Sequence, residues 1–274
     1  MSTDEHVDEP GRTVFGEAAE AYDAGRPGYH PALVTEVLSY AGAAGGTAVE
    51  VGAGTGKATV LFAGAGVAVT CLEPDDRMAA VLRRNTARFP EVEVEVSSFE
   101  SWVPGERRFG MVLAATSWHW VDRSRAWDLT AAALAPDGIV ALCWNPQGVL
   151  DPDLHAELAR IDARHGIADS PHSRPAAAYG LQAGDWSKTG WPDWPAGACR
   201  DDGRFRDLHE VRLRAEAHYA TDRYLKFLDS VSTYRLLPAD RRERALAETG
   251  DLLDRRGGGL TMLHLTDLFL ARRS

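Results

Sequence analysis

The chain has 274 residues and a mass of 29.8 kDa, which is more than one small domain needs and less than two full-size domains. Hydrophobic residues make up 45% and charged residues 26% of it, a globular balance that argues against a disordered or fibrous chain. Acidic residues outnumber basic residues by 40 to 30, and the net charge of −10 disfavours binding to nucleic acid or to an anionic membrane surface.

The start of the chain does not resemble a secretion signal. Its first ten residues are acidic and polar, and the longest uncharged stretch, Ala58 to Leu72, is shorter than the roughly 18–20 apolar residues of a membrane helix. The three cysteines, Cys71, Cys143 and Cys199, are too few and too scattered for a disulfide framework or a zinc cluster. We therefore expect a cytoplasmic protein without a bound metal.

Up to about residue 145 the chain alternates helix and strand patterns. A polar tail (1–12) precedes a helical pattern over 13–22, a Gly/Pro-rich break and a second helix that begins at Pro31. Apolar runs then alternate with helical patterns, and the expected strands are Ala48–Val51, Val67–Leu72, Val92–Val96, Gly110–Ala114 and Ile139–Trp144. Short buried runs separated by helices predict parallel strands with right-handed crossovers, and hence an α/β doubly wound sheet with helices on both faces.

The remainder of the chain has a different pattern. A helix is expected over 151–165, followed by a Pro/Gly/Trp-rich stretch over 170–203 that predicts a loop-rich cap. Alternating residues from Val211 to Tyr219 predict a strand, helices are expected over 222–228 and 238–256, and a last strand over 260–271. These strands complete a mostly parallel, seven-stranded sheet. The predicted organisation is a tail and lid helix (1–30), a core (31–150), a cap and substrate insertion (151–205) and C-terminal strands and helices (206–274).

The clearest motif is a glycine loop directly after the first expected strand, Glu50-Val51-Gly52-Ala53-Gly54-Thr55-Gly56-Lys57-Ala58. Glycines let the backbone turn and approach a ligand, and the helix that follows offers unpaired N–H groups. A phosphate-binding P-loop is excluded, because it requires glycine at Val51 and serine or threonine at Ala58. Lys57 occupies the place of a small residue in the dinucleotide fingerprint, which weakens a nicotinamide cofactor without excluding it.

The same loop resembles the acid-G-x-G-x-G motif of class I S-adenosylmethionine (SAM)-dependent methyltransferases throughout Glu50–Gly56. Glu73 ends the second expected strand, where an acidic residue should accept hydrogen bonds from both ribose hydroxyls. Further segments resemble, in order, the methyltransferase-domain-11 type, a small-molecule branch that includes trans-aconitate methyltransferase-like enzymes. They are Tyr22–Tyr29, Ser98-Phe99-Glu100, the run Trp118-His119-Trp120-Val121-Asp122 and Leu134–Gly138.

This resemblance implies that residues 31–150 form a SAM-binding, Rossmann-like core. Arg26 is expected to pair with the SAM carboxylate, although a surface arginine is the alternative, and Phe99 replaces the family's usual alanine beside the adenine. Tyr22 and Met78 could equally belong to the core. The residues expected to bind the cofactor are Tyr22, Arg26, Gly52, Ala53, Gly54, Thr55, Gly56, Glu73, Pro74, Met78, Ser98, Phe99, Ala115 and Thr116.

Methyl transfer from a sulfonium is an in-line displacement, for which alignment and a dry pocket matter most. His119 follows the fourth expected strand, on the ligand side of such a sheet, and is the candidate general base; alternatively it only positions Trp120. Tryptophans in the cap suit a flat substrate or anchor the cap. The residues expected to bind the substrate are Tyr29, His119, Trp186, Trp191 and Tyr234.

The sequence thus predicts a SAM-dependent methyltransferase that methylates an oxygen or nitrogen atom of a small metabolite, with carbon as a third acceptor, and releases S-adenosyl-L-homocysteine (SAH). The expected partners are a small-molecule substrate, with no nucleic acid and no membrane, and the expected state is a monomer or homodimer. A SAM-binding protein without methyl transfer would use the same cofactor residues and stays open. An NAD(P)-dependent oxidoreductase is the other alternative.

Overall fold

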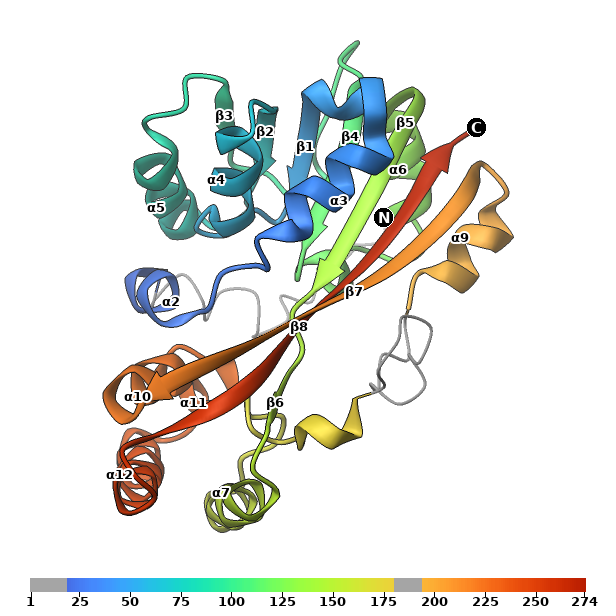
Figure 1. Cartoon of the computed structure of the whole chain (residues 1–274). Coiled ribbons are helices and arrows are strands. Elements are labelled where there is room, and N and C mark those ends of the chain that lie inside the picture. The colour runs from blue at the N-terminus through green and yellow to red at the C-terminus, as the bar shows by residue number, and fades with distance from the viewer. Residues whose placement is uncertain (1–18, 180–193) are drawn as a thin grey trace, which may run out of the picture.

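One twisted sheet forms the centre of the computed structural model, which describes residues 19–179 and 194–274 (Figure 1). Its strands are β1 (Thr47–Val51), β2 (Ala68–Leu72), β3 (Val92–Glu95), β4 (Phe109–Ala115), β5 (Leu134–Trp144), β6 (Gln147–Val149), β7 (Phe205–Ala220) and β8 (Gly259–Arg273). The strand order is β3-β2-β1-β4-β5-β8-β6, with β7 on the other edge of β8. Strands β1 to β5 are parallel, and β8 runs antiparallel to β5, β6 and β7.

This topology confirms the predicted α/β fold with a mostly parallel sheet. All seven expected strands are present, and the short β6 adds an eighth. The structure lengthens β7 and β8 beyond the expected ranges, because the two strands pair with each other from Phe205↔Arg273 to Ala220↔Gly259. The extension was not visible in the sequence, since the first residues of β7 do not alternate between apolar and polar.

The helices are α2 (Ala19–Gly25), α3 (Ala32–Ala41), α4 (Lys57–Gly64), α5 (Asp76–Thr86), α6 (Ala126–Ala133), α7 (Pro152–His165), α9 (Ala196–Asp202), α10 (Thr221–Asp229), α11 (Ser232–Arg235) and α12 (Ala239–Arg255). Local sequence sets several ends. The Asp151 carboxylate accepts hydrogen bonds from the N–H groups of Asp153 and Leu154 and so caps α7, which ends at the left-handed Gly166. Asp75 caps α5 in the same way.

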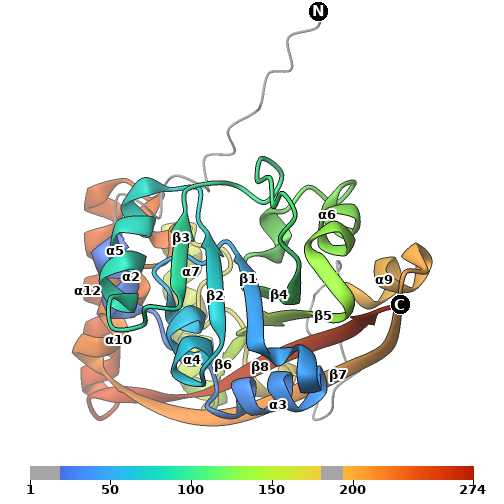
Figure 2. The same ribbon diagram turned by 90° about the horizontal axis from the view of Figure 1, so that it is seen from above.

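The parallel strands carry two hydrophobic cores, one on each face. Leu33 and Val37 of α3, Phe62 of α4 and Leu82 of α5 pack on one face. Residues of α6 and α9 pack on the other face, where Trp144 and Phe269 also lie. Figure 2 shows α3 and α4 on one side of the sheet and α6 on the other. Because both faces are covered, β1, β2, β4 and β5 are buried along most of their length, whereas the edge strand β3 is only partly buried.

A third core lies at the far end of β7 and β8. Here α7, α10, α11 and α12 surround Tyr219, Tyr224 and Phe227, all of which are buried. We call these four helices the helical lobe, and β1 to β5 with their covering helices the sheet lobe (Figure 1). One end of β8 pairs with β5 and the other end with β6, so the antiparallel β7–β8 pair runs through both lobes.

The segment predicted as a cap (151–205) is distributed over both lobes. Helix α7 belongs to the helical lobe, whereas α9 packs on the sheet through Cys199. The sequence predicts a loop where α9 lies, because this helix has only seven residues and lies in a Pro/Gly/Trp-rich stretch without a helical pattern. Within residues 19–179 and 194–274, no helix is long and apolar enough to cross a membrane.

Candidate functional site

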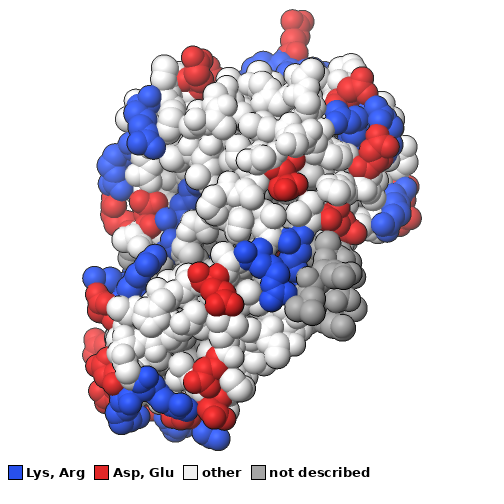
Figure 3. Space-filling model, in the orientation of Figure 1, with Lys and Arg blue, Asp and Glu red and all other residues white. Residues whose placement is uncertain are grey.

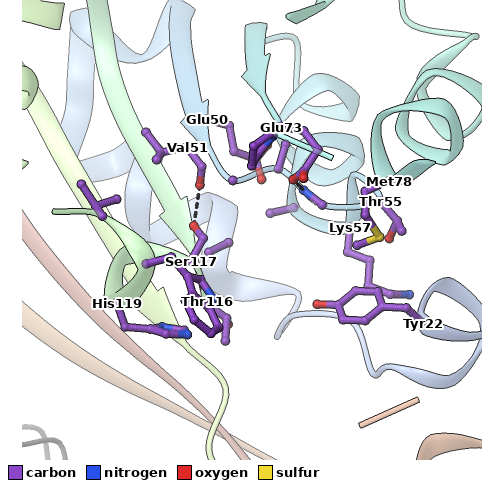
Figure 4. A pocket seen from close by; sticks show the side chains of 18 of the residues that line it. Tyr22, Glu50, Val51, Thr55, Lys57, Glu73, Met78, Thr116, Ser117 and His119 are labelled. Carbon is purple, nitrogen blue, oxygen red and sulfur yellow. Dashed lines mark hydrogen bonds between the residues drawn. The ribbon is translucent and has the colours of Figure 1, made fainter. Parts of the chain in front are cut away.

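A cavity of about 330 Å³ opens between the two lobes, at the carboxyl ends of β1, β2 and β4. The chain leaves β1 for β2 on one side, while β4 lies on the other side of β1, so the cavity sits where the direction of winding reverses. Ligands of doubly wound sheets bind at such points. Figure 4 shows the glycine loop and Glu73 above the space, Tyr22 and Lys57 on one side, and Thr116 and His119 on the other.

The glycine loop owes its shape to three positions with a backbone conformation that glycine adopts more easily than other residues. Gly52, Gly54 and Gly56 have φ angles of 65°, 59° and 88°, in the left-handed region. A Cβ on Gly52 would lie 2.7 Å from Cβ of Ser117, whose hydroxyl donates a hydrogen bond to the Val51 carbonyl. The loop backbone therefore lies directly against the end of β4, and the space in front of it stays open.

Glu73 is the buried acid of this cavity, with 6% of its surface exposed. Its Oε2 atom accepts a hydrogen bond from the Gly54 N–H at 2.8 Å, and its Oε1 atom accepts one from the Asp75 N–H at 3.0 Å. Two backbone donors thus hold the carboxylate beside the glycine loop.

Glu50 lies beneath the same loop and is 1% exposed. The pKa of its carboxyl is raised to about 7, mainly because burial disfavours the charged form. The Thr59 hydroxyl, which donates a hydrogen bond to Oε2 at 2.7 Å, opposes this rise, and the nearby Glu73 carboxylate adds to it. The acid that begins the glycine motif therefore changes its charge near neutral pH.

Residues of α2 and α4 form the next wall. The Arg26 guanidinium lies over the Tyr22 ring at 5.1 Å, and Lys57 Nζ donates to the Asp23 carbonyl at 2.7 Å. Burial lowers the pKa of the Lys57 amine, although the Asp23 carboxylate partly restores it. Glycine-loop residues 50–58, Glu73, Met78 and these side chains make up what we call the glycine-loop end of the cavity.

The opposite wall follows β4 and β5. Thr116 has a φ angle of 59°, which is unusual for threonine, and its N–H donates to the Cys143 carbonyl at 2.8 Å. The Tyr29 hydroxyl donates to the Ala115 carbonyl at 3.0 Å, and desolvation raises the pKa of this phenol well above its ordinary value. This wall, defined by Tyr29, Thr116, His119, Asn145, Gln147 and Ser232, is the His119 end of the cavity.

His119 lies on the short 3₁₀ helix Trp118–Trp120 that follows β4. Its ring centroid is 4.9 Å from that of Trp120, and its side chain is exposed at the cavity. The surrounding protein desolvates the imidazole and lowers its pKa below the ordinary value of 6.5. A neutral imidazole at physiological pH has one ring nitrogen that can accept a proton.

Comparison with known proteins identifies the domain that carries this cavity. Residues 48–138 match the family model described as a methyltransferase domain. The chain contains a class I SAM-dependent methyltransferase domain. The predicted family and its cofactor, SAM, are thereby confirmed at the level of the domain.

Individual relatives agree with the methyltransferase domain. Uncharacterized methyltransferases of Mycobacterium bovis and Mycobacterium tuberculosis are each 36% identical to this chain over 131 residues, which is 48% of this chain and 51% of theirs. The chain therefore matches these curated relatives over about half of their length. The trans-aconitate-like branch stays a prediction, since neither relative is described as such an enzyme.

Solved structures extend the likeness in fold to most of the chain. A proposed type II methyltransferase from Anaeromyxobacter dehalogenans aligns with a TM-score of 0.62 over 90% of this chain and 97% of that one, at 21% identity. A SAM-dependent methyltransferase from Thiobacillus denitrificans, solved with SAH, aligns with a TM-score of 0.50 over 97% and 99%, at 12% identity. At these identities the likeness concerns the fold alone.

The structure brings most of the predicted site residues of the methyltransferase domain together. Those that line the cavity are Tyr22, Arg26, Tyr29, Gly52, Ala53, Gly54, Thr55, Glu73, Pro74, Met78, Ser98, Phe99, Ala115, Thr116 and His119. Trp186 and Trp191 lie outside the described residues, and their expected role in substrate binding stays a prediction.

Two predicted residues lie away from the cavity surface. Gly56 begins α4, where a Cβ would lie 2.6 Å from Cδ1 of Leu82, so it shapes the loop from behind. Tyr234 is fully buried in the helical lobe, and its hydroxyl donates to Oδ1 of Asp162 at 3.4 Å. Helix α11 turns Ser232 toward the cavity instead, because Tyr234 faces the opposite side of this single turn.

Sequence reasoning missed several residues of the cavity wall. Asn145 and Gln147 follow β5, and only the general rule that ligands bind at the carboxyl ends of parallel strands could have suggested them. Lys57 was treated as a departure from a motif, yet it lines the site. The other lining residues that were not predicted are Pro27, Glu50, Val51, Ala58, Ser97, Glu100, Ser117, Trp120, Val121 and Ser232.

Buried polar atoms on the cavity wall indicate where a ligand is held. Arg26 Nε, Thr55 Oγ1, Glu100 Oε2 and Gln147 Oε1 are buried and have no hydrogen-bond partner among the described residues. Such atoms are uncommon in folded proteins, since leaving one unpaired costs about 1–3 kcal/mol. No cluster of three or more metal-binding side chains occurs within 19–179 and 194–274.

Proposed function

We propose that this protein transfers the methyl group of SAM to an oxygen or nitrogen atom of a small molecule, with carbon as a third acceptor. The observation that carries the proposal is the buried Glu73 carboxylate beside a loop with three left-handed glycines, inside a methyltransferase domain. A carboxylate in this place accepts hydrogen bonds from two ribose hydroxyls, and the loop lets the rest of the cofactor lie against the main chain.

The residues at the glycine-loop end fit SAM. Arg26 has a buried nitrogen without a partner, and a guanidinium is the preferred group for binding a carboxylate such as that of SAM. The unpartnered Thr55 hydroxyl lies in the loop itself, while Ser98 and Phe99 follow β3, where the adenine is expected. When bound, SAM supplies a methyl group that its sulfonium already activates for displacement.

The chain itself has to align the acceptor and exclude water. Tyr22 and Arg26, on a segment that also packs against α10 and α5, cover the cavity from the side of the helical lobe. His119 stands at the other wall with a lowered pKa, and we assign it the role of accepting the proton that the methyl acceptor loses. The alternative, that His119 only positions Trp120, remains the competing assignment.

The size of the cavity and the net charge of the molecule favour a small substrate. A cavity of about 330 Å³ is at the lower end of the range for small-molecule sites, and under this proposal it holds SAM as well as the methyl acceptor. The net charge is −10, and on the face drawn in Figure 3 basic side chains are interspersed with acidic ones. Both features disfavour nucleic acid as a substrate. A cytoplasmic location, a monomeric or homodimeric state and the trans-aconitate-like branch are part of the same proposal.

The proposal is tested by binding of SAM to the purified chain and to Glu73→Ala, measured by isothermal titration calorimetry. We expect Glu73→Ala to weaken SAM binding roughly 100-fold, because hydrogen bonds to a charged group contribute about 1.5–3 kcal/mol each. The exposed Glu106→Ala is the matched control and should bind SAM like the wild type. No SAM binding by the wild type, or equal binding by Glu73→Ala, would falsify the proposal.

Two further measurements separate the alternatives. Tight SAM binding without methylated product from phenols, amines or carboxylic acids would favour a SAM-binding protein that does not transfer methyl groups. Binding of NADH in place of SAM would favour the oxidoreductase.

A further inference from the structure

Gln147 lines the cavity and carries a hydrogen-bond acceptor that no described residue pairs. Its Nε2 atom donates to the Asn145 carbonyl at 3.2 Å, so the amide nitrogen is occupied and the amide oxygen points elsewhere. That oxygen, Oε1, is buried without a partner among the described residues, although Gln147 lines the cavity. A site that desolvates an acceptor and leaves it unpaired gains when a ligand brings a donor.

The framework around Gln147 keeps this acceptor in place. Its backbone carbonyl accepts a hydrogen bond from the Tyr179 hydroxyl at 2.8 Å, and it pairs with His264 where β6 joins β8. The neighbouring Asn145 side chain accepts from the Thr266 hydroxyl at 2.8 Å and donates to the Gly28 carbonyl at 3.4 Å. Contacts from several segments thus hold the Asn145–Gln147 turn, as a binding site requires.

Gln147 and His119 belong to the same edge of the sheet. Ala115 of β4 pairs with Cys143 of β5, and His119 and Gln147 each follow four residues after one of these partners. Both side chains line one cavity, together with Ser232 from α11. A substrate whose methyl-accepting atom lies next to His119 therefore has Gln147 on a neighbouring segment.

This end of the cavity offers uncharged groups. Desolvation lowers the pKa of His119 and raises that of Tyr29, so both are neutral at pH 7, like Asn145, Gln147 and Ser232. The charged side chains of the cavity come from the glycine-loop end and from Glu100, which follows β3. Burying a charged substrate group among neutral side chains is costly, whereas a neutral donor is matched by the free amide oxygen.

We propose that Gln147 determines specificity: its amide oxygen accepts a hydrogen bond from the O–H or N–H group of an uncharged substrate, such as an alcohol, a phenol or a neutral amine, in the bound state that precedes transfer of that proton to His119. The inference deepens the proposed function and rests on it, because it assigns the His119 end of the cavity to the methyl acceptor. Gln147 acts on binding and is not required for chemistry at the methyl group.

The test compares a ligand that has the donor with a ligand in which a methyl group replaces the donor hydrogen, using the whole protein saturated with SAH. Dissociation constants for phenol and anisole are measured by ligand-observed NMR, with benzoate and benzylammonium as charged probes. We expect phenol to bind roughly 10-fold or more tightly than anisole, and tighter than either charged probe, because anisole leaves the Gln147 oxygen unpaired.

Variants then assign the effect to Gln147. Gln147→Met keeps a side chain of similar length without the acceptor, and it should bring the ratio of phenol to anisole affinity to about 1 while SAH binds as before. Gln147→Glu adds a negative charge and should favour benzylammonium. Val103→Met, on a residue that is 79% exposed, is the control and should keep the wild-type ratio.

Each failure points to a different claim. If the wild type does not bind SAH, the proposed function and this inference both fall. If it binds SAH but prefers no uncharged donor over anisole, or prefers a charged probe, only the inference is wrong. A preference for phenol that survives in Gln147→Met would likewise overturn the role of Gln147.

Discussion

The glycine-loop end of the cavity is centred on the backbone of one loop, with side chains from neighbouring segments around it, whereas the His119 end is built from side chains of four segments. At the first end, residues 50–58 follow one strand, and Glu73 ends the strand that pairs with it. At the second end, Tyr29, His119, Gln147 and Ser232 come from the α2–α3 connection, the end of β4, β6 and α11. Under the proposed function, the centre of the cofactor site is therefore formed by residues close together in the sequence, and recognition of the methyl acceptor depends on the whole fold.

The largest effect that separates the two ends is expected at His119. We predict that His119→Asn lowers kcat about 100-fold to 10,000-fold, the usual contribution of a general base, and leaves the dissociation constant of SAH unchanged. Because desolvation lowers the pKa of His119, the wild-type base is already neutral at pH 7, and kcat should fall only at acid pH. Steady-state rates between pH 5 and pH 8 measure both effects. A kcat within about 3-fold of wild type would leave His119 the role of positioning Trp120.

A side chain added at Gly52 should disrupt the glycine-loop end, because it would meet Ser117 behind the loop. In Gly52→Val the new Cβ would lie 2.7 Å from that of Ser117, at a φ of +65° that a branched side chain rarely adopts. We predict a loss of about 1–3 kcal/mol in the free energy of unfolding and a loss of SAH binding. Urea denaturation and calorimetry measure the two quantities. Gly197→Ala is the control, since nothing lies within 4 Å of its Cβ position; a wild-type-like Gly52→Val would contradict this account of the loop.

The buried Glu50 should give the glycine-loop end a dependence on pH. Its pKa is raised from 4.5 to about 7, so between these values the folded protein keeps a proton that the unfolded chain has lost. The free energy of unfolding therefore falls as pH rises through this window, by at most about 1.4 kcal/mol per pH unit. Glu50→Gln removes this contribution, so the stability of the variant relative to the wild type should increase from pH 5 to pH 7.

Denaturant unfolding at several pH values measures this difference. Glu93→Gln, on the exposed face of β3, is the control and should show no such trend. A constant difference between Glu50→Gln and wild type would mean that Glu50 stays charged in the folded protein.

The smallest effects concern α11 and sharpen the limits of the His119 end. Tyr234→Phe removes a hydroxyl that donates to Asp162 inside the helical lobe, so it should cost about 0.5–1.5 kcal/mol of stability and leave the KM of the methyl acceptor unchanged. Ser232→Ala should leave stability nearly unchanged and change the KM of the methyl acceptor by roughly 2-fold to 10-fold. Thermal unfolding and initial rates measure these effects. The reverse pattern would return Tyr234 to the substrate site.

The sequence predicted the sheet lobe well, because its signals are local. Buried apolar runs, the Asp75 cap and the glycine loop are each encoded within about ten residues. The residues expected to bind the cofactor, from Tyr22 to Thr116, followed from the same segments and from the resemblance they carry, and most of them line the cavity.

The His119 end could not be predicted in the same way. Gln147 belongs to a strand of three residues that exists only because β8 passes beside it. Which residue of α11 faces the cavity depends on how one helical turn packs on α10, and the sequence does not distinguish Ser232 from Tyr234. Long-range packing, rather than pattern, decides these positions.

The antiparallel β7–β8 pair has a consequence for how the two lobes respond to heat and denaturant. The same pair of strands completes the sheet beside β5 and carries α10, α11 and α12 between its two halves. Heat or denaturant that detaches β8 from β5 also removes the strand on which β6 and the Gln147 turn depend. The two lobes should therefore melt in one cooperative transition, and the acceptor side of the cavity should be no less durable than the cofactor side.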